Sequence, residues 1–252
     1  MAGTLGATIP SNLSDRLSSM SALRTLPVAI FVATIPFFLT TTTVRIVVNT
    51  PALYSYGFDR YDIPKRTGIE RKELISAGRQ IREYFNNENA LLDVRVIRGG
   101  VLRSIYNQRE IDHMRDVKDL IRNVYIVQFL SGLFLLGFIA SLLGIRGLRS
   151  YKDIVRYAGL GSVITIGLVA VAGIASFIGF EKVFLAFHLI SFSNDLWQLD
   201  PSKDYLIAMF PQAFFYDATM VIGLAITAEA TVLTLVPIVL TGWRPWRVLR
   251  QR

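Results

Sequence analysis

The 252-residue chain contains no cysteine and only two histidines, His113 and His188. Without cysteine it has no disulfide bond, no thiol nucleophile and no metal site built on thiolates. Charged residues are also scarce, at 18% of the chain, whereas a soluble domain carries about 25%. Apolar residues make up 52%, and the mean hydropathy is +0.43. These values predict a membrane protein.

Four apolar runs are each long enough to cross a bilayer, which takes roughly 20 helical residues. They cover residues 27–48, 124–145, 158–180 and 218–240. We therefore expect an all-α polytopic membrane protein with four transmembrane helices. No small-residue cleavage motif follows the first run, so we interpret it as an uncleaved signal anchor.

The basic residues outside these runs predict how the chain is oriented in the membrane. The short loop 146–157 carries four basic residues and one acidic residue, and the tail 241–252 carries four basic residues and no acidic residue. The positive-inside rule places both on the cytoplasmic side, together with the N-terminal segment 1–26. In this N-in, C-in topology, residues 49–123 and 181–217 are extracytoplasmic.

The formal net charge of +8 has the same explanation. The basic residues gather at the ends of the apolar runs, where they meet anionic lipid headgroups. This placement indicates membrane phospholipid as a partner, and we expect no nucleic acid. Arg45, near the outer end of the first run, either snorkels to the interface or binds a lipid phosphate.

The extracytoplasmic segment 49–123 predicts a small α+β cap. Thr67–Glu70 fits a capping box, and apolar residues follow it at helical spacing, so we expect a helix that ends near Asn86. These apolar residues are Leu74, Ala77, Ile81, Tyr84 and Phe85. Residues 92–97 and 101–106 then flank a Gly-Gly pair, a pattern typical of a β-hairpin.

The first histidine follows this hairpin. Asn107 and Glu110 are spaced to cap a helix that continues into the second apolar run. On this helix Arg109, His113 and Asp116 share one face. A carboxylate three residues after His113 would fix the tautomer of the ring and raise its basicity. The alternative is a solvated helix face whose charged residues make only weak surface pairs.

The second histidine follows the third apolar run. Taken alone, His188 fits a structural residue at the membrane interface. However, the predicted topology brings His113 and His188 to about the same depth on the extracytoplasmic side, which favours a pair. Possible donors and acceptors follow His188, namely Ser191, Ser193, Asn194, Asp195 and Asp200.

Aromatic residues are dense between Trp197 and Tyr216. They predict an aromatic belt at the outer interface. The alternative is an acyl-chain groove, for which Phe187 and Phe210 are candidate lipid-binding residues.

Other chemistries have less support in the sequence. Glu110 and His113 have the spacing of a metal-ligand pair on a helix, but a full site needs a second such pair or more histidines. No Gly-x-Ser-x-Gly elbow of a serine hydrolase occurs. We therefore expect no metal and no other cofactor.

Two blocks of the sequence resemble one known family. The first is the run Arg109–Lys118, and the second contains Phe187–His188, Phe192–Pro201 and Met209–Pro211. Together with four spans in this order, they are similar to the lipoprotein intramolecular transacylase (Lit) family of bacterial membrane proteins.

The resemblance implies an acyltransferase of the bacterial cytoplasmic membrane with its site on the extracytoplasmic face. The family's activity moves the sn-2 acyl chain of a diacylglyceryl-cysteine onto the α-amine of that cysteine, which gives a lyso-form lipoprotein. A diacylated lipoprotein is then the substrate. His113 and His188 correspond to the family's catalytic histidines, and the second block adds Asn194, Asp195 and Trp197, with Asp200, as supporting residues.

Two imidazoles suit this reaction, because the amine must lose a proton and the leaving alkoxide must gain one. We expect His113, oriented by Asp116, to act as the base and His188 to assist the leaving group, while Asn194 or a backbone N–H stabilises the oxyanion. The two roles can be exchanged, or one imidazole can be acylated transiently. The alternatives to a transacylase are another membrane-surface lipid hydrolase, a metal-dependent enzyme, or a non-catalytic binding protein.

Overall fold

The structure is a computed structural model that describes the backbone of residues 11–243 and the side chains of residues 25–243. Most of it is helical. The helices are α1 (Ser11–Asn49), α2 (Pro51–Arg60), α3 (Ile63–Thr67), α4 (Arg71–Phe85), α5 (Gln108–Arg146), α6 (Tyr151–Ser191), α7 (Tyr205–Met209) and α8 (Gln212–Thr241). Strands β1 (Arg95–Arg98) and β2 (Val101–Ser104) form a hairpin, and a 3-10 turn (Gly147–Ser150) joins α5 to α6.

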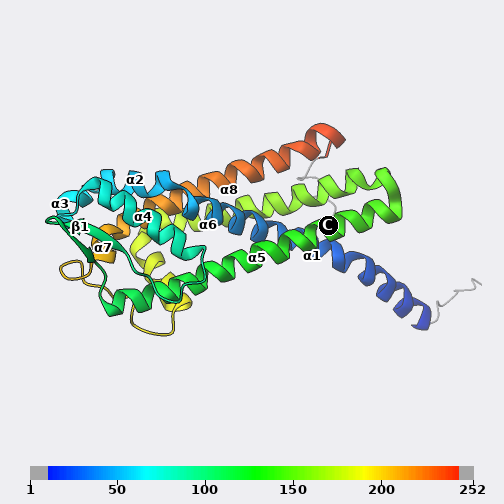
Figure 1. The fold of residues 1–252 in the computed structure, drawn as a ribbon. Helices are drawn as coiled ribbons and strands as arrows, with labels where there is room; N and C mark the ends of the chain where they lie inside the picture. The colour runs from blue at the N-terminus through cyan, green and yellow to red at the C-terminus, as the bar shows by residue number, and fades with distance from the viewer. Residues whose placement is uncertain (1–10, 244–252) are drawn as a thin grey trace, which may run out of the picture.

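The long helices α1, α5, α6 and α8 form a bundle, and the shorter elements gather at one end of it as a cap (Figure 1). Helix α1 packs against α5, α6 and α8, and α6 packs along α8. Gly161 of α6 lies so close to α1 that a Cβ atom there would be 2.8 Å from the carbonyl oxygen of Val32. A small residue at this position therefore allows the two helices to approach closely.

Three helical stretches are long and apolar enough to cross a membrane, Thr25–Asn49, Gln108–Ser191 and Gln212–Thr241. The second has 84 residues and contains both α5 and α6, which fold back on each other (Figure 1). The expected helical architecture is thus confirmed, while the count of four crossings stays a prediction. Charged residues are absent from 123–145 of α5 and from 157–180 of α6, so both histidines lie outside these apolar parts.

The cap has a hydrophobic core to which the first turns of α5 and α8 also contribute. The predicted amphipathic helix is α4, and all five of its predicted apolar residues are buried. The predicted capping box is wrong, because Thr67 is the last residue of α3 and its hydroxyl donates to the carbonyl of Ile63. Gly68, with a φ of 67°, ends α3 in the left-handed conformation, and α4 begins only after Glu70.

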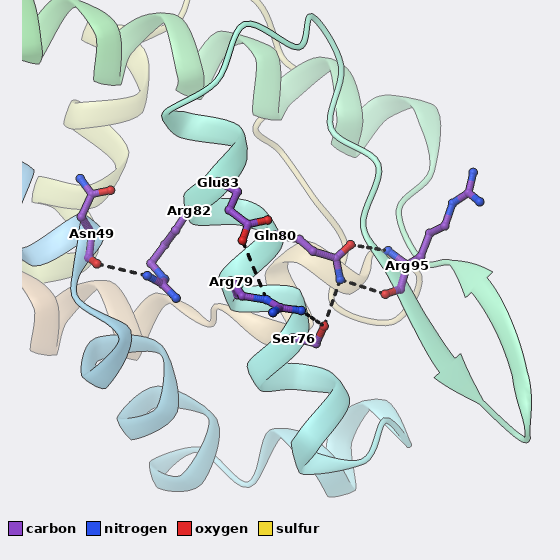
Figure 2. A network of polar contacts seen from close by, with 7 residues as sticks. All are labelled: Asn49, Ser76, Arg79, Gln80, Arg82, Glu83 and Arg95. Carbon is purple, nitrogen blue, oxygen red and sulfur yellow. Dashed lines mark hydrogen bonds and ion pairs between the residues drawn. The ribbon is translucent and has the colours of Figure 1, made fainter.

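Helix α4 is tied to both the hairpin and the bundle (Figure 2). The hairpin is confirmed with shorter strands, and Gly99 and Gly100 at its turn both have positive φ. The side-chain amide of Gln80 donates to the backbone oxygen of Arg95 and accepts from its N–H, both at 3.0 Å. Arg82 donates to the backbone oxygen of Asn49 at the end of α1.

The predicted cap of α5 is confirmed. The Asn107 side chain accepts the N–H of Glu110, and the Glu110 carboxylate accepts the N–H of Asn107. From there α5 continues without interruption to Arg146. One helix therefore carries His113 and also enters the bundle, so the position of His113 is coupled to the bundle.

Candidate active site

A cavity of about 340 Å³ lies where the cap meets the bundle. Helices α1, α2, α4, α5, α6, α7 and α8 all contribute to its lining, which is mainly aliphatic and aromatic. His113 and His188 both line it, and Tyr54 is the other lining residue with an ionisable side chain. An apolar cavity with a few convergent polar groups is the usual form of a small-molecule or lipid site.

His188 lies near the end of α6 and is 8% exposed. Its Nδ1 is 2.7 Å from the carbonyl oxygen of Phe184, one helical turn earlier. Because a carbonyl oxygen can only accept, Nδ1 carries the hydrogen and Nε2 of the neutral ring keeps its lone pair. Burial lowers the pKa of His188, and the hydrogen bond to Phe184 opposes this shift.

His113 lies near the start of α5 and is 7% exposed. Its Nδ1 is buried and has no hydrogen-bond partner among the residues that the structure describes. Burial, together with the nearby His188, lowers the pKa of His113 to about 4, while Asp116 opposes the shift. The ring is therefore neutral at physiological pH, and a neutral imidazole has one N–H to donate.

The structure brings the two histidines to one cavity. The ring of Phe192 lies beside both imidazoles, with centroid distances of 5.2 Å to His113 and 5.7 Å to His188. Trp197 packs on His188 at 4.9 Å. The loop that follows α6 thus covers both rings and shields them from water.

Polar contacts between α5 and this loop hold the two walls of the cavity together. Arg109 donates to the backbone oxygen of Asp195. The side-chain amide of Asn194 donates to Asp116 at 2.8 Å. Asp116 thus has a hydrogen-bond partner on the loop, and the expected bond to His113 is not among the contacts of these residues.

Glu110 makes the deepest of these contacts. Its carboxylate is 0% exposed and accepts the N–H of Leu206 at 2.6 Å and that of Asn107 at 2.8 Å. Burial raises the pKa of Glu110, and these backbone donors oppose the shift. The solvated helix face considered as an alternative is therefore wrong at this position. Each carboxylate oxygen thus accepts a backbone N–H, and Glu110 joins the start of α5 to α7.

Comparison with known proteins identifies the family. The model of the family "Lipoprotein intramolecular transacylase Lit" matches residues 29–215. The chain belongs to the Lit family. It is therefore an acyltransferase of lipoprotein modification, and a membrane protein.

Solved structures agree with this membership. The membrane-integral transacylase Lit of Bacillus cereus is 25% identical, with a TM-score of 0.70 over 87% of this chain and 94% of that one. A variant of the same protein with one histidine changed to alanine has a TM-score of 0.72, at 22% identity, over 90% and 97% of the two chains. An uncharacterised protein of Aquifex aeolicus is 27% identical over 173 residues, which is 67% of this chain and 74% of that protein.

Apart from Arg45, the remaining candidate residues of this Lit family member fall into two groups. Phe187 and Phe210 line the cavity. Asp195 accepts from Gln198, and Asp200 accepts from Ser202, which lowers the pKa of Asp200 to about 2. These two acidic side chains thus stabilise turns of the loop.

Arg45 lies apart from the cavity. It donates to Gln128 of α5 at 2.8 Å and lies over the ring of Tyr125 at 4.5 Å. These contacts join α1 to α5, and the guanidinium remains exposed. Lipid binding by Arg45 stays a prediction.

Two residues of the Lit family site were not predicted from the sequence. The backbone oxygen of Phe184 orients His188. The sequence could have indicated this contact, because residues four positions apart are neighbours on a helix. Phe192 contacts both histidines. No local pattern indicates that contact, because it depends on how the loop folds back over α5.

Proposed function

We propose that this enzyme moves the sn-2 acyl chain of a diacylglyceryl-cysteine onto the α-amine of the same cysteine, with His113 and His188 as its catalytic residues. The observation that carries the proposal is that both imidazoles line one apolar cavity beside the same ring, Phe192. Because the amine and the ester belong to one molecule, the enzyme captures one substrate and only has to align its two reacting groups.

The substrate reaches this cavity from the outer leaflet of the bacterial cytoplasmic membrane. In the proposed topology α1, α5, α6 and α8 each cross the bilayer once, and both chain termini are cytoplasmic. The basic loop 146–157 and tail 241–252 support this orientation. The cap and the cavity then lie on the extracytoplasmic face, where membrane phospholipid surrounds the bundle.

His188 is the proton carrier in this proposal. Its Nε2 takes a proton from the amine as the nitrogen bonds to the ester carbonyl carbon. When the bond between that carbon and the sn-2 oxygen breaks, the same proton passes to the oxygen and becomes the glycerol hydroxyl. The Phe184 carbonyl supports this role, because it holds Nδ1 protonated and makes the ring more basic.

His113 acts as a neutral hydrogen-bond donor to the oxyanion of the tetrahedral intermediate. Its lowered pKa, about 4, supports a donor rather than a base. This differs from the roles expected from the sequence, where His113, oriented by Asp116, was the base and His188 only assisted the leaving group. Asp116 instead holds Asn194 and so positions the loop over both rings.

The test is expression in a bacterium whose lipoproteins are only diacylated, followed by tandem mass spectrometry of their N-terminal peptides. The product is an isomer of the substrate, so its mass is unchanged. Fragmentation must show an acyl group on the cysteine nitrogen, and the α-amine must become unreactive toward amine reagents. The double variant His113→Asn, His188→Asn is the control.

The other outcomes identify other activities. Loss of one acyl mass with a free amine would mean a lipid hydrolase. N-acylation that a chelator abolishes would mean a metal-dependent enzyme. N-acylation that persists in the double variant would refute the two-histidine mechanism.

A further inference from the structure

The cavity has a cap end and a membrane end. On α5 its lining runs from His113 to Ile121, and on α8 from Phe214 to Ile222, so each helix borders it for about 12 Å. Val47 is the lining residue of α1 that lies deepest in the bundle. The histidines are at the cap end of this space, and Ile222 is at the membrane end.

Ile222 closes the membrane end. Its side chain lines the cavity and also packs against the buried core of the bundle. That core contains Phe31, Ile35, Leu39, Leu135, Ile226 and Ala230. One turn deeper than Val47, the hydroxyl of Thr43 donates to Glu229 of α8 at 3.1 Å. The space that begins at the histidines therefore ends against packed side chains.

We propose that Ile222 is the residue that limits the length of the acyl chain this enzyme transfers. The inference rests on the proposed function. If the ester carbonyl lies between His113 and His188, the chain attached to that carbonyl is the part of the substrate that extends from the imidazoles. Apart from Thr219, the lining toward Ile222 is apolar, which suits a hydrocarbon chain.

Chain length matters in a space with a closed end. A chain that is too short leaves lining atoms without a partner, and one that is too long must bend or leave methylene groups outside. Because the chain moves from lipid into the cavity, its preference for one length comes from close packing against the lining and not from transfer out of water. Shortening the side chain at position 222 therefore favours longer acyl chains, and enlarging it favours shorter ones.

The test uses Ile222→Ala and Ile222→Phe in full-length enzyme, expressed in a host whose diacylated lipoproteins carry acyl chains of mixed length. Leu224→Ala is the matched control, because Leu224 lies on the same helix but is 71% exposed. Tandem mass spectrometry gives the N-acyl chain and the chain retained on glycerol separately. The measured quantity is the length distribution of the N-acyl chain relative to the sn-2 chain of unreacted substrate.

We expect Ile222→Ala to shift the N-acyl distribution toward longer chains and Ile222→Phe to shift it toward shorter ones. Leu224→Ala should match the wild type. Ile222→Val, which removes one methyl group, replaces Ile222→Ala if the latter does not fold, and should shift the distribution in the same direction by less.

Three results would overturn the inference. They are an unchanged N-acyl distribution in active Ile222 variants, an equal shift in Leu224→Ala, and a shift confined to the chain retained on glycerol. The last result would assign this space to the sn-1 chain. Failure of the wild-type enzyme to form any N-acyl product is a different outcome, because it contradicts the proposed function itself.

Discussion

His188 and His113 line the same cavity but are held in different ways. The ring of His188 is hydrogen-bonded to Phe184 of its own helix, so α6 sets its tautomer locally. His113 has no such bond at Nδ1 among the described residues, and its surroundings are set by distant parts of the chain. The start of α5 is held by contacts with the loop and α7, among them the bond from the N–H of Leu206 to Glu110.

This difference connects structure to chemistry. A ring that must accept and return a proton needs a defined lone pair, which a carbonyl partner at its other nitrogen provides. A ring that only donates a hydrogen bond needs to stay neutral, and burial is sufficient for that. The predictions below test this division of roles, from the largest expected effect to the smallest.

Loss of the proton carrier should have the largest effect. We expect His188→Asn to reduce lyso-lipoprotein formation by about 100-fold to 10,000-fold, because asparagine cannot carry the proton. The rate is measured by tandem mass spectrometry in membranes with equal amounts of enzyme. Ser193→Asn, on the exposed loop, is the control and should stay near the wild-type rate.

Loss of the hydrogen-bond donor at position 113 should lower the rate strongly, and a side chain that can still donate should restore part of it. We expect His113→Phe to lower the rate by about 100-fold to 1,000-fold. His113→Asn should retain more activity than His113→Phe, because its amide can still donate. Equal rates for the two variants, in the same assay, would contradict the donor role.

The buried carboxylate that docks α5 should matter for stability. Glu110→Gln turns an amide N–H₂ toward backbone N–H groups, so we expect a loss of about 2 kcal/mol in the free energy of unfolding. Thermal unfolding in detergent measures it. Glu83→Gln, at an exposed site on α4, should change stability little. A comparable loss there would contradict a specific stabilising role of the buried Glu110 carboxylate.

The pH dependence of stability should depend on His113. Its pKa is about 4 in the folded protein and 6.5 ordinarily, so between these values the unfolded chain binds more protons. The contribution of the neutral, buried His113 to the free energy of unfolding is fully present when the pH is above the ordinary pKa of 6.5. It is lost as the pH falls toward the folded-state pKa of about 4. We expect a decrease of about 2 kcal/mol from about pH 7 to about pH 5 that His113→Phe lacks. Parallel pH profiles for the two proteins would argue against a buried neutral His113.

Asp116 should have the smallest effect. Asp116→Asn keeps an oxygen that can accept from Asn194, so we expect a loss of activity within about fivefold. If Asp116 instead oriented His113 as a base, the loss would approach about 10,000-fold. The same mass-spectrometric assay distinguishes the two values.

Much of this arrangement follows from local patterns. The buried face of α4, the Gly-Gly hairpin and the Asn107–Glu110 cap all depend on residues within a few positions of one another, and the sequence shows them directly. The capping box expected at Thr67 failed because Gly68 ends a preceding short helix, and that competition is not visible in the box itself.

The polar contacts of the site could not be predicted in the same way. Asp116 was expected to contact His113 three residues away, yet its partner is Asn194, 78 positions along the chain. Glu110 pairs with the N–H of Leu206, at a separation of 96. A carboxylate on a helix face can contact either a near neighbour or a distant segment, and packing determines which.

The sequence alone determined that this protein is built from apolar helices and that a helix and a β-hairpin precede the second of its apolar runs. Apolar runs and turn residues determine these features because they act over short separations. Tertiary structure decided which imidazole has a defined tautomer, which carboxylate is buried, and where the cavity ends at Ile222. These depend on how helices far apart in the chain pack together, and burial sets the chemistry of each ring only after that packing is complete.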